Sequence, residues 1–273
     1  MNRVETTVVI ESELQRALDC GELIRLYQPV VDLATGAPVQ VETLLRWDHP
    51  ARGLLVPGEF LLDEDDSSLF VRIGWSVVIE AARRAGMWRH AFPNRPITVT
   101  VNLFDDHLER RDLPNRIEYL MEDNEVPAPD GLAFEVGERH LLSKRRRTRD
   151  RLTVLHNCGV TVVVDDLGAA SAATDVDPDP LRDWAVELFG TLRAFPLGMV
   201  KLDPRFVRRL ESDERLRAVI DAAHASGIAV VALAVEDEEM ATRAQRVGFD
   251  LGQGFHFARP ARPTEIDELL AAG

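Results

Sequence analysis

The feature that most constrains the fold is an alternation of short apolar segments with longer amphipathic ones, repeated along the chain. Eight apolar segments have the length and the Val, Ile and Leu content of buried strands: Leu23–Val31, Pro38–Arg46, Ile97–Leu103, Leu132–Val136, Thr161–Asp165, Met199–Leu202, Ile228–Leu233 and Leu251–Phe257. Helical patterns lie between them at Trp75–His90, Leu113–Asn124, Thr148–Asn157, Leu216–Ser226 and Glu239–Val247. This order predicts an α/β fold with a mostly parallel sheet covered by helices.

The number of strands selects an architecture within that class. Eight strands in 273 residues favour a single TIM-like (β/α)₈ barrel. A doubly wound open sheet is the alternative, but its Gly-rich first turn, G-x-G-x-x-G, does not occur in the sequence.

Composition and charge exclude several classes of protein. Hydrophobic residues make up 45% of the chain, which excludes global disorder. No apolar run approaches the ~20 residues of a membrane helix, and Met1–Ile10 lacks a signal core, so we expect a cytoplasmic protein without membrane contact. Two cysteines fit a reducing compartment. A net charge of −14 disfavours nucleic-acid polymers as partners.

Polar side chains stand at or near the ends of six expected strands. They are Glu42, Asn102, Glu135, Asp165 with Asp166, Lys201 and Gln253. The C-terminal strand ends of a barrel form its active site. One polar residue there is usually part of a solvated rim, but four acids and an amide together favour a site for Mg²⁺, Mn²⁺ or Ca²⁺. A pair of such metals suits phosphodiester chemistry.

The motifs around these residues narrow the function. They are Tyr27-Gln28-Pro29, Glu42-Thr43-Leu44, Val164-Asp165-Asp166-Leu167-Gly168, Lys201-Leu202-Asp203 and Gln253-Gly254-Phe255. In order and spacing the chain resembles the EAL family of cyclic di-GMP phosphodiesterases, from about Glu11 to Arg262. The resemblance implies a modified (β/α)₈ barrel with one antiparallel strand. It also implies cyclic di-GMP or a related dinucleotide as ligand, and it leaves open a homodimer and a protein partner.

The resemblance also implies a role for each matched position. The implied metal ligands are Glu42, Asn102, Glu135, Asp165 and Asp166. The implied catalytic residues are Lys201, which holds the attacking water or a phosphate oxygen, with Glu42 and Asp165. The implied ligand contacts are Gln28, Arg46 and Gln253, and Glu138 is expected to steady the loop after the Asp pair. The implied cofactor is Mg²⁺ or Mn²⁺, with Ca²⁺ as an inhibitor.

The chain departs from the family pattern most seriously at the seventh expected strand. The family's Ala-Glu-Gly-Val-Glu reads Ala232-Leu233-Ala234-Val235-Glu236 here, so Leu233 replaces a catalytic acid. Glu236 is three positions further on, and on an extended strand it points to the opposite face. We therefore do not expect Glu236 to replace the lost acid. The signature triplet has Thr43 in place of Ala, which leaves its carboxylate intact.

Two loops also depart from the pattern. After Asp166 the family's second glycine, Thr and Tyr are missing, and an insertion that includes a helix at Leu181–Phe189 is expected before Lys201. An acidic stretch at Asp63–Ser68 replaces a milder segment that approaches the guanine in the family. The family's loop chemistry and dimer contacts are therefore not assumed for this chain.

We expect an N-terminal extension over residues 1–10, an EAL-like domain over 11–265 with its insertion near 172–190, and a C-terminal tail over 266–273. The favoured function is a sensor or regulator in second-messenger signalling that binds cyclic di-GMP with impaired or no hydrolysis. One alternative is an active phosphodiesterase that gives pGpG. The other is a protein-interaction scaffold that no longer binds nucleotide.

Overall fold

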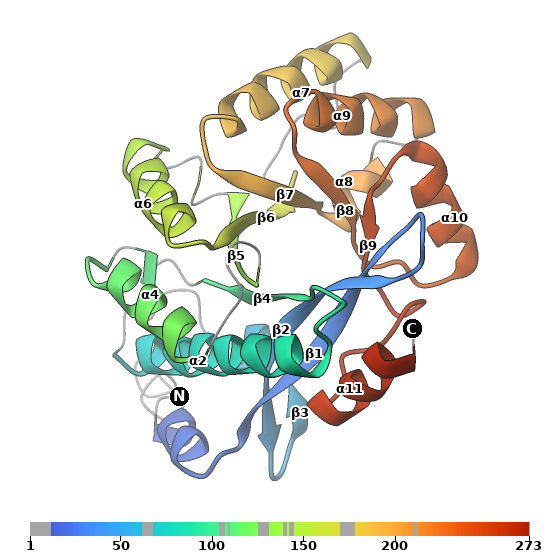
Figure 1. Ribbon diagram of the computed structural model, residues 1–273. Helices are drawn as coiled ribbons and strands as arrows, with labels where there is room; N and C mark the ends of the chain where they lie inside the picture. The colour runs from blue at the N-terminus through green and yellow to red at the C-terminus, as the bar shows by residue number, and fades with distance from the viewer. Residues whose placement is uncertain are drawn as a thin grey trace, which may run out of the picture.

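The protein folds into a closed barrel, seen nearly along its axis in Figure 1. The structure is a computed structural model that describes residues 12–61, 68–103, 107–108, 110–124, 131–138, 141, 145–169, 178–209 and 212–272. The barrel strands are β1 (Leu23–Asp32), β2 (Pro38–His49), β4 (Thr98–Asn102), β5 (Leu132–Gly137), β6 (Thr161–Leu167), β7 (Leu197–Leu202), β8 (Ala229–Ala232) and β9 (Leu251–Gly252). Each of the eight predicted strands overlaps one of them.

The sheet order is β1-β9-β8-β7-β6-β5-β4-β2-β3, and pairing of β1 with β2 closes the barrel. The short strand β3 (Gly53–Leu55) extends β2 outside it. Strand β1 is antiparallel to both β2 and β9. The pairings from β2 through β4 to β9 are parallel. The prediction of a modified (β/α)₈ barrel with one antiparallel strand is confirmed, and β1 is that strand.

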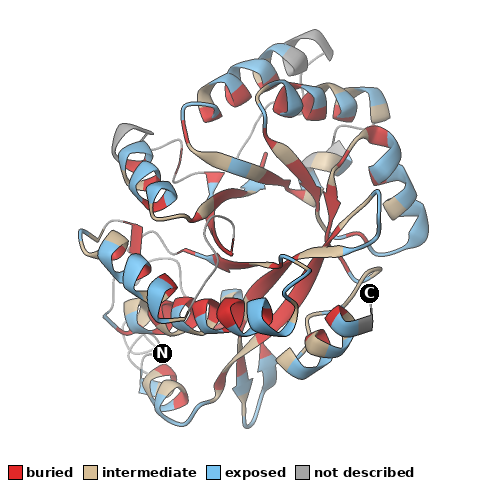
Figure 2. Cartoon of the chain, viewed as in Figure 1, coloured by how far each residue is buried: buried red, intermediate tan, exposed pale blue. Residues whose placement is uncertain are grey.

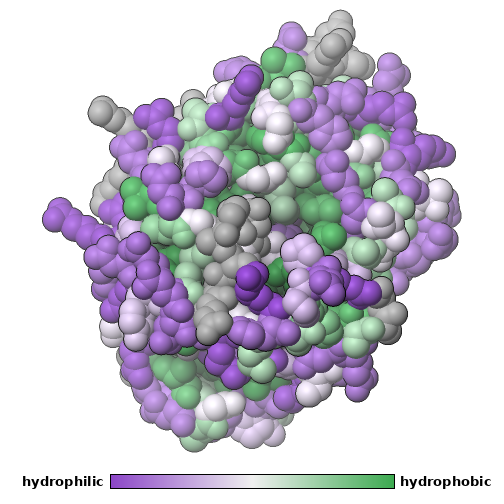
Figure 3. Space-filling view, viewed as in Figure 1, coloured by the Kyte–Doolittle hydropathy of each residue, from purple (hydrophilic) through white to green (hydrophobic). Residues whose placement is uncertain are grey.

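Helices surround the barrel, and buried residues line the surfaces between helices and strands (Figure 2). The helices are α2 (Ser68–Ala91), α4 (Leu113–Asp123), α6 (Arg145–Asn157), α7 (Pro178–Leu192), α8 (Pro204–Arg209), α9 (Asp213–Ala225), α10 (Glu238–Val247) and α11 (Pro263–Ala272). A 3₁₀ turn, η1, spans Pro57–Glu59. Hydrophilic residues cover much of the outer surface in Figure 3. None of the helices in the described ranges is long and apolar enough to cross a membrane.

The C-terminal segment differs from the expected tail, because residues 263–272 form α11. Ile266 and Leu270 are buried in the main core. The indole N–H of Trp88 donates to Asp267 at 2.6 Å, and Arg95 donates to the carbonyl of Leu270 at 2.6 Å. The predicted boundary at residue 265 therefore cuts through a helix that packs on the barrel.

The insertion predicted before Lys201 falls partly outside the described residues, which resume at residue 178. From there the chain forms α7, so the expected helix at Leu181–Phe189 lies within a longer one. Ala185, Phe189 and Leu192 bury their side chains, and α7 packs against α9. The acidic stretch at residues 63–66 lies outside the described part of the chain.

Candidate functional site

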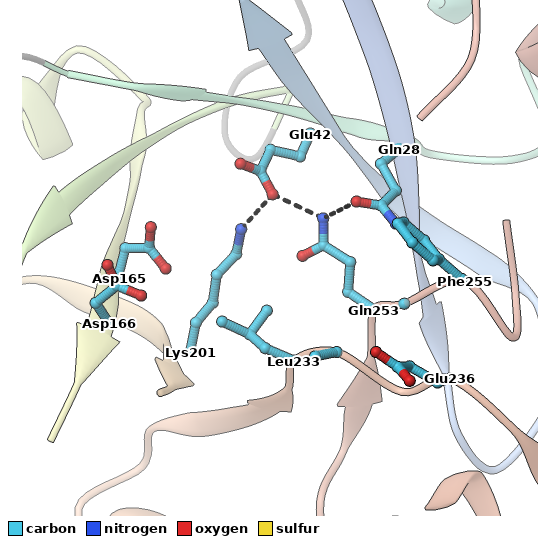
Figure 4. A pocket seen from close by; sticks show the side chains of 11 residues that line it. Gln28, Glu42, Asp165, Asp166, Lys201, Leu233, Glu236, Gln253 and Phe255 are labelled. Carbon is cyan, nitrogen blue, oxygen red and sulfur yellow. Dashed lines mark hydrogen bonds and ion pairs between the residues drawn. The ribbon is translucent and has the colours of Figure 1, made fainter. Parts of the chain in front are cut away.

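A pocket of about 300 Å³ opens at the carboxyl ends of the barrel strands (Figure 4). Its lining residues come from four strands and from the segments that follow β8 and β9: Gln28, Glu42, Asp165, Asp166, Lys201, Leu233, Ala234, Glu236, Gln253, Gly254 and Phe255. Parallel β6, β7 and β8 run in the same direction, so residues at their carboxyl ends meet here although they are far apart in the sequence.

Lys201 stands at the centre of a buried polar cluster. Its ammonium lies 2.8 Å from Glu42 and 2.5 Å from Glu135, and all three side chains are at least 90% buried. Glu42 also accepts a hydrogen bond from Gln253 at 2.7 Å and one from Asn102 at 3.3 Å. Four strands and the residue that follows β9 thus direct donors and acceptors to one point inside the mouth of the barrel.

Burial and charge shift the pKa values of these groups strongly. Burial acts to raise the pKa of Glu42, but the charge and hydrogen bond of Lys201 outweigh it and hold that pKa below its usual value. Burial, with the charge of Glu42, raises the pKa of Glu135 to about 8. Burial also raises the pKa of Asp165 to about 6. The cluster therefore holds more carboxylates than its one lysine neutralises, and added positive charge would stabilise their ionised forms.

The end of β6 places Asp165 and Asp166 at the pocket. The β6–β7 pairing is irregular between Val164 and Leu167, and Asp166 adopts φ 53°, in the left-handed region. Asp tolerates this conformation better than most residues. Beyond the pair, buried Glu138 accepts a hydrogen bond from the backbone N–H of Gly168 at 3.0 Å. This contact joins the end of β5 to the loop after the Asp pair.

The end of β8 presents Leu233 to the same pocket. Figure 4 shows its side chain between Lys201 and Gln253. It packs against an apolar group inside the barrel formed by Val30, Val231 and Leu251. A hydrocarbon side chain there neither ligates a cation nor transfers a proton.

The expectation that Glu236 points to the opposite face is wrong, because it assumed that the strand continues. Strand β8 ends at Ala232, and Ala234 turns the chain with φ 54°. Glu236 therefore lines the pocket as an exposed residue at its rim. In Figure 4 it lies on the far side of Leu233 from Lys201 and the Asp pair.

Three further residues that the sequence predicted for the site, Gln28, Arg46 and Asn102, differ in whether they line the pocket. Gln28 lines the pocket, accepts a hydrogen bond from Gln253 at 3.3 Å and donates to the carbonyl of Ala258 at 3.0 Å. Arg46 is on β2, but its guanidinium donates to the carbonyl of Leu45 at 2.7 Å and does not line the pocket. Asn102 joins the cluster through its hydrogen bond to Glu42.

Phe255, for which the sequence predicted no role, lines the pocket with half of its surface exposed. The guanidinium of Arg259 lies over this ring, 4.2 Å from the centre of the Phe255 ring. The signal was present, since Phe255 follows Gln253-Gly254 directly. A flat ring beside a polar cluster offers a surface on which another planar group can stack.

The donor set suits a hard cation. Glu135 Oε2 is buried without a hydrogen-bond partner in the described part of the chain. Carboxylate oxygens of Glu42, Asp165 and Asp166 face the same pocket. As the described side chains stand, no three acidic, His or Cys groups are gathered around one point for a metal, because Lys201 lies among the carboxylates. Oxygen ligands of this kind favour Mg²⁺ or Mn²⁺ over softer metals.

Comparisons with known proteins find a matching family and related sequences for this chain. A family model described as EAL domain matches residues 11–176 and 187–260, which leaves out ten residues at the start of α7 and just before it. The cyclic di-GMP phosphodiesterase RocR of Pseudomonas aeruginosa is 31% identical over 91% of this chain, which spans 60% of that protein's length.

Two solved structures extend this likeness. The PaMucR phosphodiesterase in its c-di-GMP complex is 26% identical with a TM-score of 0.81, over 94% of this chain and 99% of that one. The EAL domain of Mycobacterium smegmatis DcpA is 27% identical with a TM-score of 0.69, over 93% of this chain and 97% of that one.

Proposed function

The chain belongs to the EAL domain family, and on that premise we propose that it binds cyclic di-GMP at the mouth of the barrel and hydrolyses it slowly or not at all. Such a domain acts as a sensor or regulatory module, because ligand occupancy is its output. The observation behind the proposal is Leu233, a hydrocarbon side chain that lies between Lys201 and Gln253 in the pocket. The related PaMucR structure, which contains c-di-GMP, supports the choice of ligand.

The retained residues suit binding of a cyclic dinucleotide with a metal. Glu42, Asn102, Glu135, Asp165 and Asp166 would hold Mg²⁺ or Mn²⁺, with Ca²⁺ as a competitor that does not support reaction. When bound, such a metal polarises a phosphoryl oxygen and lowers the pKa of water. Lys201 supplies a fixed positive charge for a phosphate oxygen. Gln28 and Gln253, which line the pocket, would orient the nucleotide through the hydrogen-bonding groups of their amides. Arg46 would contact a phosphate only if its guanidinium left the carbonyl of Leu45.

The missing acid limits turnover rather than affinity. General acid or base groups contribute about 10²–10⁴ in rate, whereas a neutral side chain in their place still allows ligand to bind. Glu138, through its hydrogen bond to Gly168, is positioned to keep the loop after Asp166 in place for binding.

An active phosphodiesterase that gives pGpG is the second candidate, because the carboxylates and Lys201 are retained. A scaffold that binds only another protein is the third candidate, favoured by the altered loop after Asp166. The phosphodiesterase would convert cyclic di-GMP to pGpG, whereas the scaffold would neither retain the nucleotide nor cleave it.

Equilibrium dialysis against cyclic di-GMP with Mn²⁺, followed by chromatography of the nucleotide, separates these functions. We expect retained and intact cyclic di-GMP. Linear pGpG that grows with protein concentration would replace the proposal with the active phosphodiesterase. Neither retention nor cleavage would favour the scaffold. Asp165→Ala is the matched variant, and we expect it to weaken Mn²⁺-dependent binding at least tenfold; an unchanged isotherm would remove the proposed metal role of Asp165.

A further inference from the structure

Two polar residues outside the site described above point into the interior of the barrel. Gln40 precedes Glu42 by two residues on β2, so strand alternation directs both side chains to the same face. Thr100 on β4 pairs with Glu42 in register, and paired residues on neighbouring strands share a face. Val30, opposite Gln40 on β1, belongs to the apolar group inside the barrel. Gln40 and Thr100 therefore lie inside the barrel with Glu42.

Gln40, Thr100 and Glu135 carry buried polar atoms that have no hydrogen-bond partner in the described residues. Gln40 and Glu135 are 1% exposed and Thr100 is 0% exposed. The unpaired atoms are the amide nitrogen and oxygen of Gln40, the hydroxyl of Thr100 and Oε2 of Glu135. Leaving such atoms unpaired is costly, and most buried side-chain polar atoms bond to protein or to ordered water. Three such residues on neighbouring strands indicate a shared partner.

The strand register brings these three residues together. Strand β4, with Thr100, lies between β2, with Gln40, and β5, with Glu135. Thr100 is paired with Glu42, two residues after Gln40, and with Ala133, two residues before Glu135. Neighbouring strands are about 4.8 Å apart and each residue adds about 3.3 Å, so each Cα lies roughly 8 Å from that of Thr100. The methyl group of Ala133 fills little of the space beside Thr100.

The chemistry of these groups specifies a small neutral molecule that both donates and accepts hydrogen bonds. An amide offers donors and an acceptor, a hydroxyl offers both, and a carboxylate only accepts. Lys201 already places its ammonium 2.5 Å from Glu135, so a second cation beside it would be repelled. Burial of all three residues excludes an organic ligand. Water meets these conditions, and a buried water typically makes about three hydrogen bonds to otherwise unpaired groups.

We propose that Gln40, Thr100 and Glu135 enclose a buried water site inside the barrel, and that the bound water fixes the orientation of the Glu135 carboxylate. Gln40 and Thr100 are then positioning residues, because they act on Glu135 through the water and do not touch a ligand in the pocket. The water site stands independently of any activity. Its effect on metal binding rests on the proposed function, in which Glu135 is a metal ligand.

Overhauser effects between the Gln40 side-chain amide and water test the site directly. Loss of one amide signal pair in ¹⁵N-labelled Gln40→Met identifies the Gln40 signals. We expect cross-peaks to water whose nuclear and rotating-frame effects have opposite signs, as for a water that stays bound longer than the protein tumbles. Thr100→Val should reduce them at least twofold, because it removes a hydrogen-bond partner at nearly equal volume, and Thr100→Ser should retain them. An amide that contacts the Thr100 hydroxyl but no water would overturn the proposal.

Mn²⁺ affinity, measured by electron paramagnetic resonance of the free ion, separates positioning from a merely structural role. We expect Gln40→Met and Thr100→Val each to weaken Mn²⁺ binding at least threefold, and Thr100→Ser to keep it.

Thr43→Val is the matched control. The Thr43 hydroxyl is also buried and unpaired among the described residues, but Thr43 follows Glu42 on β2 and so points to the outer face. Equal losses of Mn²⁺ affinity in Thr43→Val and Thr100→Val would overturn the positioning role. Absence of Mn²⁺ binding by the wild-type protein would contradict the proposed function, whereas the contact between Gln40 and water would still decide whether the water site exists.

Discussion

The ends of β6 and β8 share an unusual backbone conformation but place different side chains at the pocket. Among the described residues, only Asp166 and Ala234 are non-glycine residues with positive φ, at 53° and 54°. Asp166 lies one residue before the end of β6, and Ala234 lies two residues after the end of β8. Each directly follows a residue that lines the pocket, Asp165 in one case and Leu233 in the other. At β6 the turn presents carboxylates. At β8 it presents a hydrocarbon side chain.

Hydrogen bonds from other segments of the chain hold the backbone after both strands. Glu138 holds the backbone of Gly168 after β6. After β8, the backbone of Val235 exchanges hydrogen bonds with Gln253 and His256. The backbone that would aim an acid from position 233 is thus held in place, and a leucine occupies that position. The difference between the two strand ends is chemical rather than structural, and the following variants test that statement.

Leu233→Glu has the largest expected effect. If the scaffold at β8 is intact, a restored acid should raise the rate of pGpG formation by about 10²–10⁴, the usual contribution of a general acid or base. The measurement is product chromatography with Mn²⁺ at saturating cyclic di-GMP. Leu233→Gln is the control, since it is polar and of similar size but cannot transfer a proton. Unchanged turnover with retained binding would shift the cause to the altered loop after Asp166.

Gly254→Ala should disrupt the contact between Gly254 and the backbone of Val235, which follows β8. A Cβ at Gly254 would lie 2.0 Å from the carbonyl oxygen of Val235 and 2.3 Å from its nitrogen, so backbone must move. We expect a loss of about 3 kcal/mol in the free energy of unfolding, the upper end of overpacking costs. Urea denaturation measures it. Gly190→Ala in α7, where a Cβ meets nothing within 4 Å, should instead be neutral or stabilising. Similar losses in both variants would contradict the steric account.

These strand ends also show what the sequence could and could not predict. Runs such as Val162–Val164 predict buried strands because both of their faces must be apolar. Polar residues directly after such runs predict a shared site, because carboxyl ends of parallel strands meet at one rim. Both inferences need only local pattern and general topology. The family resemblance implied one antiparallel strand but not which one, and only the structure identifies it as β1.

The predictions that were wrong concern segments in which the backbone does not keep the regular alternation of a strand. The position of Glu236 was misjudged because alternation was continued past Ala232, and nothing in an Ala marks a left-handed turn. Strand β9 was predicted to reach Phe257 but pairs only at Leu251–Gly252. Gly254 instead packs tightly against the Val235 backbone, a tertiary contact that no local pattern encodes.

Glu138→Ala should break the anchoring of β6. It removes a buried acceptor from the Gly168 N–H, which costs about 1–3 kcal/mol in the free energy of unfolding. We expect weaker Mn²⁺-dependent nucleotide binding as well, because the loop that follows the Asp pair loses its support. Calorimetric titration and urea denaturation give the two values. Glu138→Gln keeps an oxygen acceptor and should fall between wild type and Glu138→Ala. If Glu138→Gln is as damaging as Glu138→Ala, the charge rather than the hydrogen bond is what matters.

Ala234→Gly and Asp166→Gly have the smallest expected effects on stability, and they are expected to differ in their effect on binding. Glycine removes the left-handed strain of Ala, about 1–2 kcal/mol, at a conformational-entropy cost of about 0.5–1 kcal/mol. Ala234→Gly should therefore raise the free energy of unfolding by roughly 0.5–1 kcal/mol and leave nucleotide binding unchanged. Asp166→Gly relieves less strain, because Asp already tolerates this region, but it deletes a proposed metal ligand. We expect it to change stability little without metal and to weaken Mn²⁺-dependent binding strongly. Equal effects on binding from both variants would mean that the two strand ends serve the ligand through their backbone alone, and that the carboxylate of Asp166 adds nothing to the site.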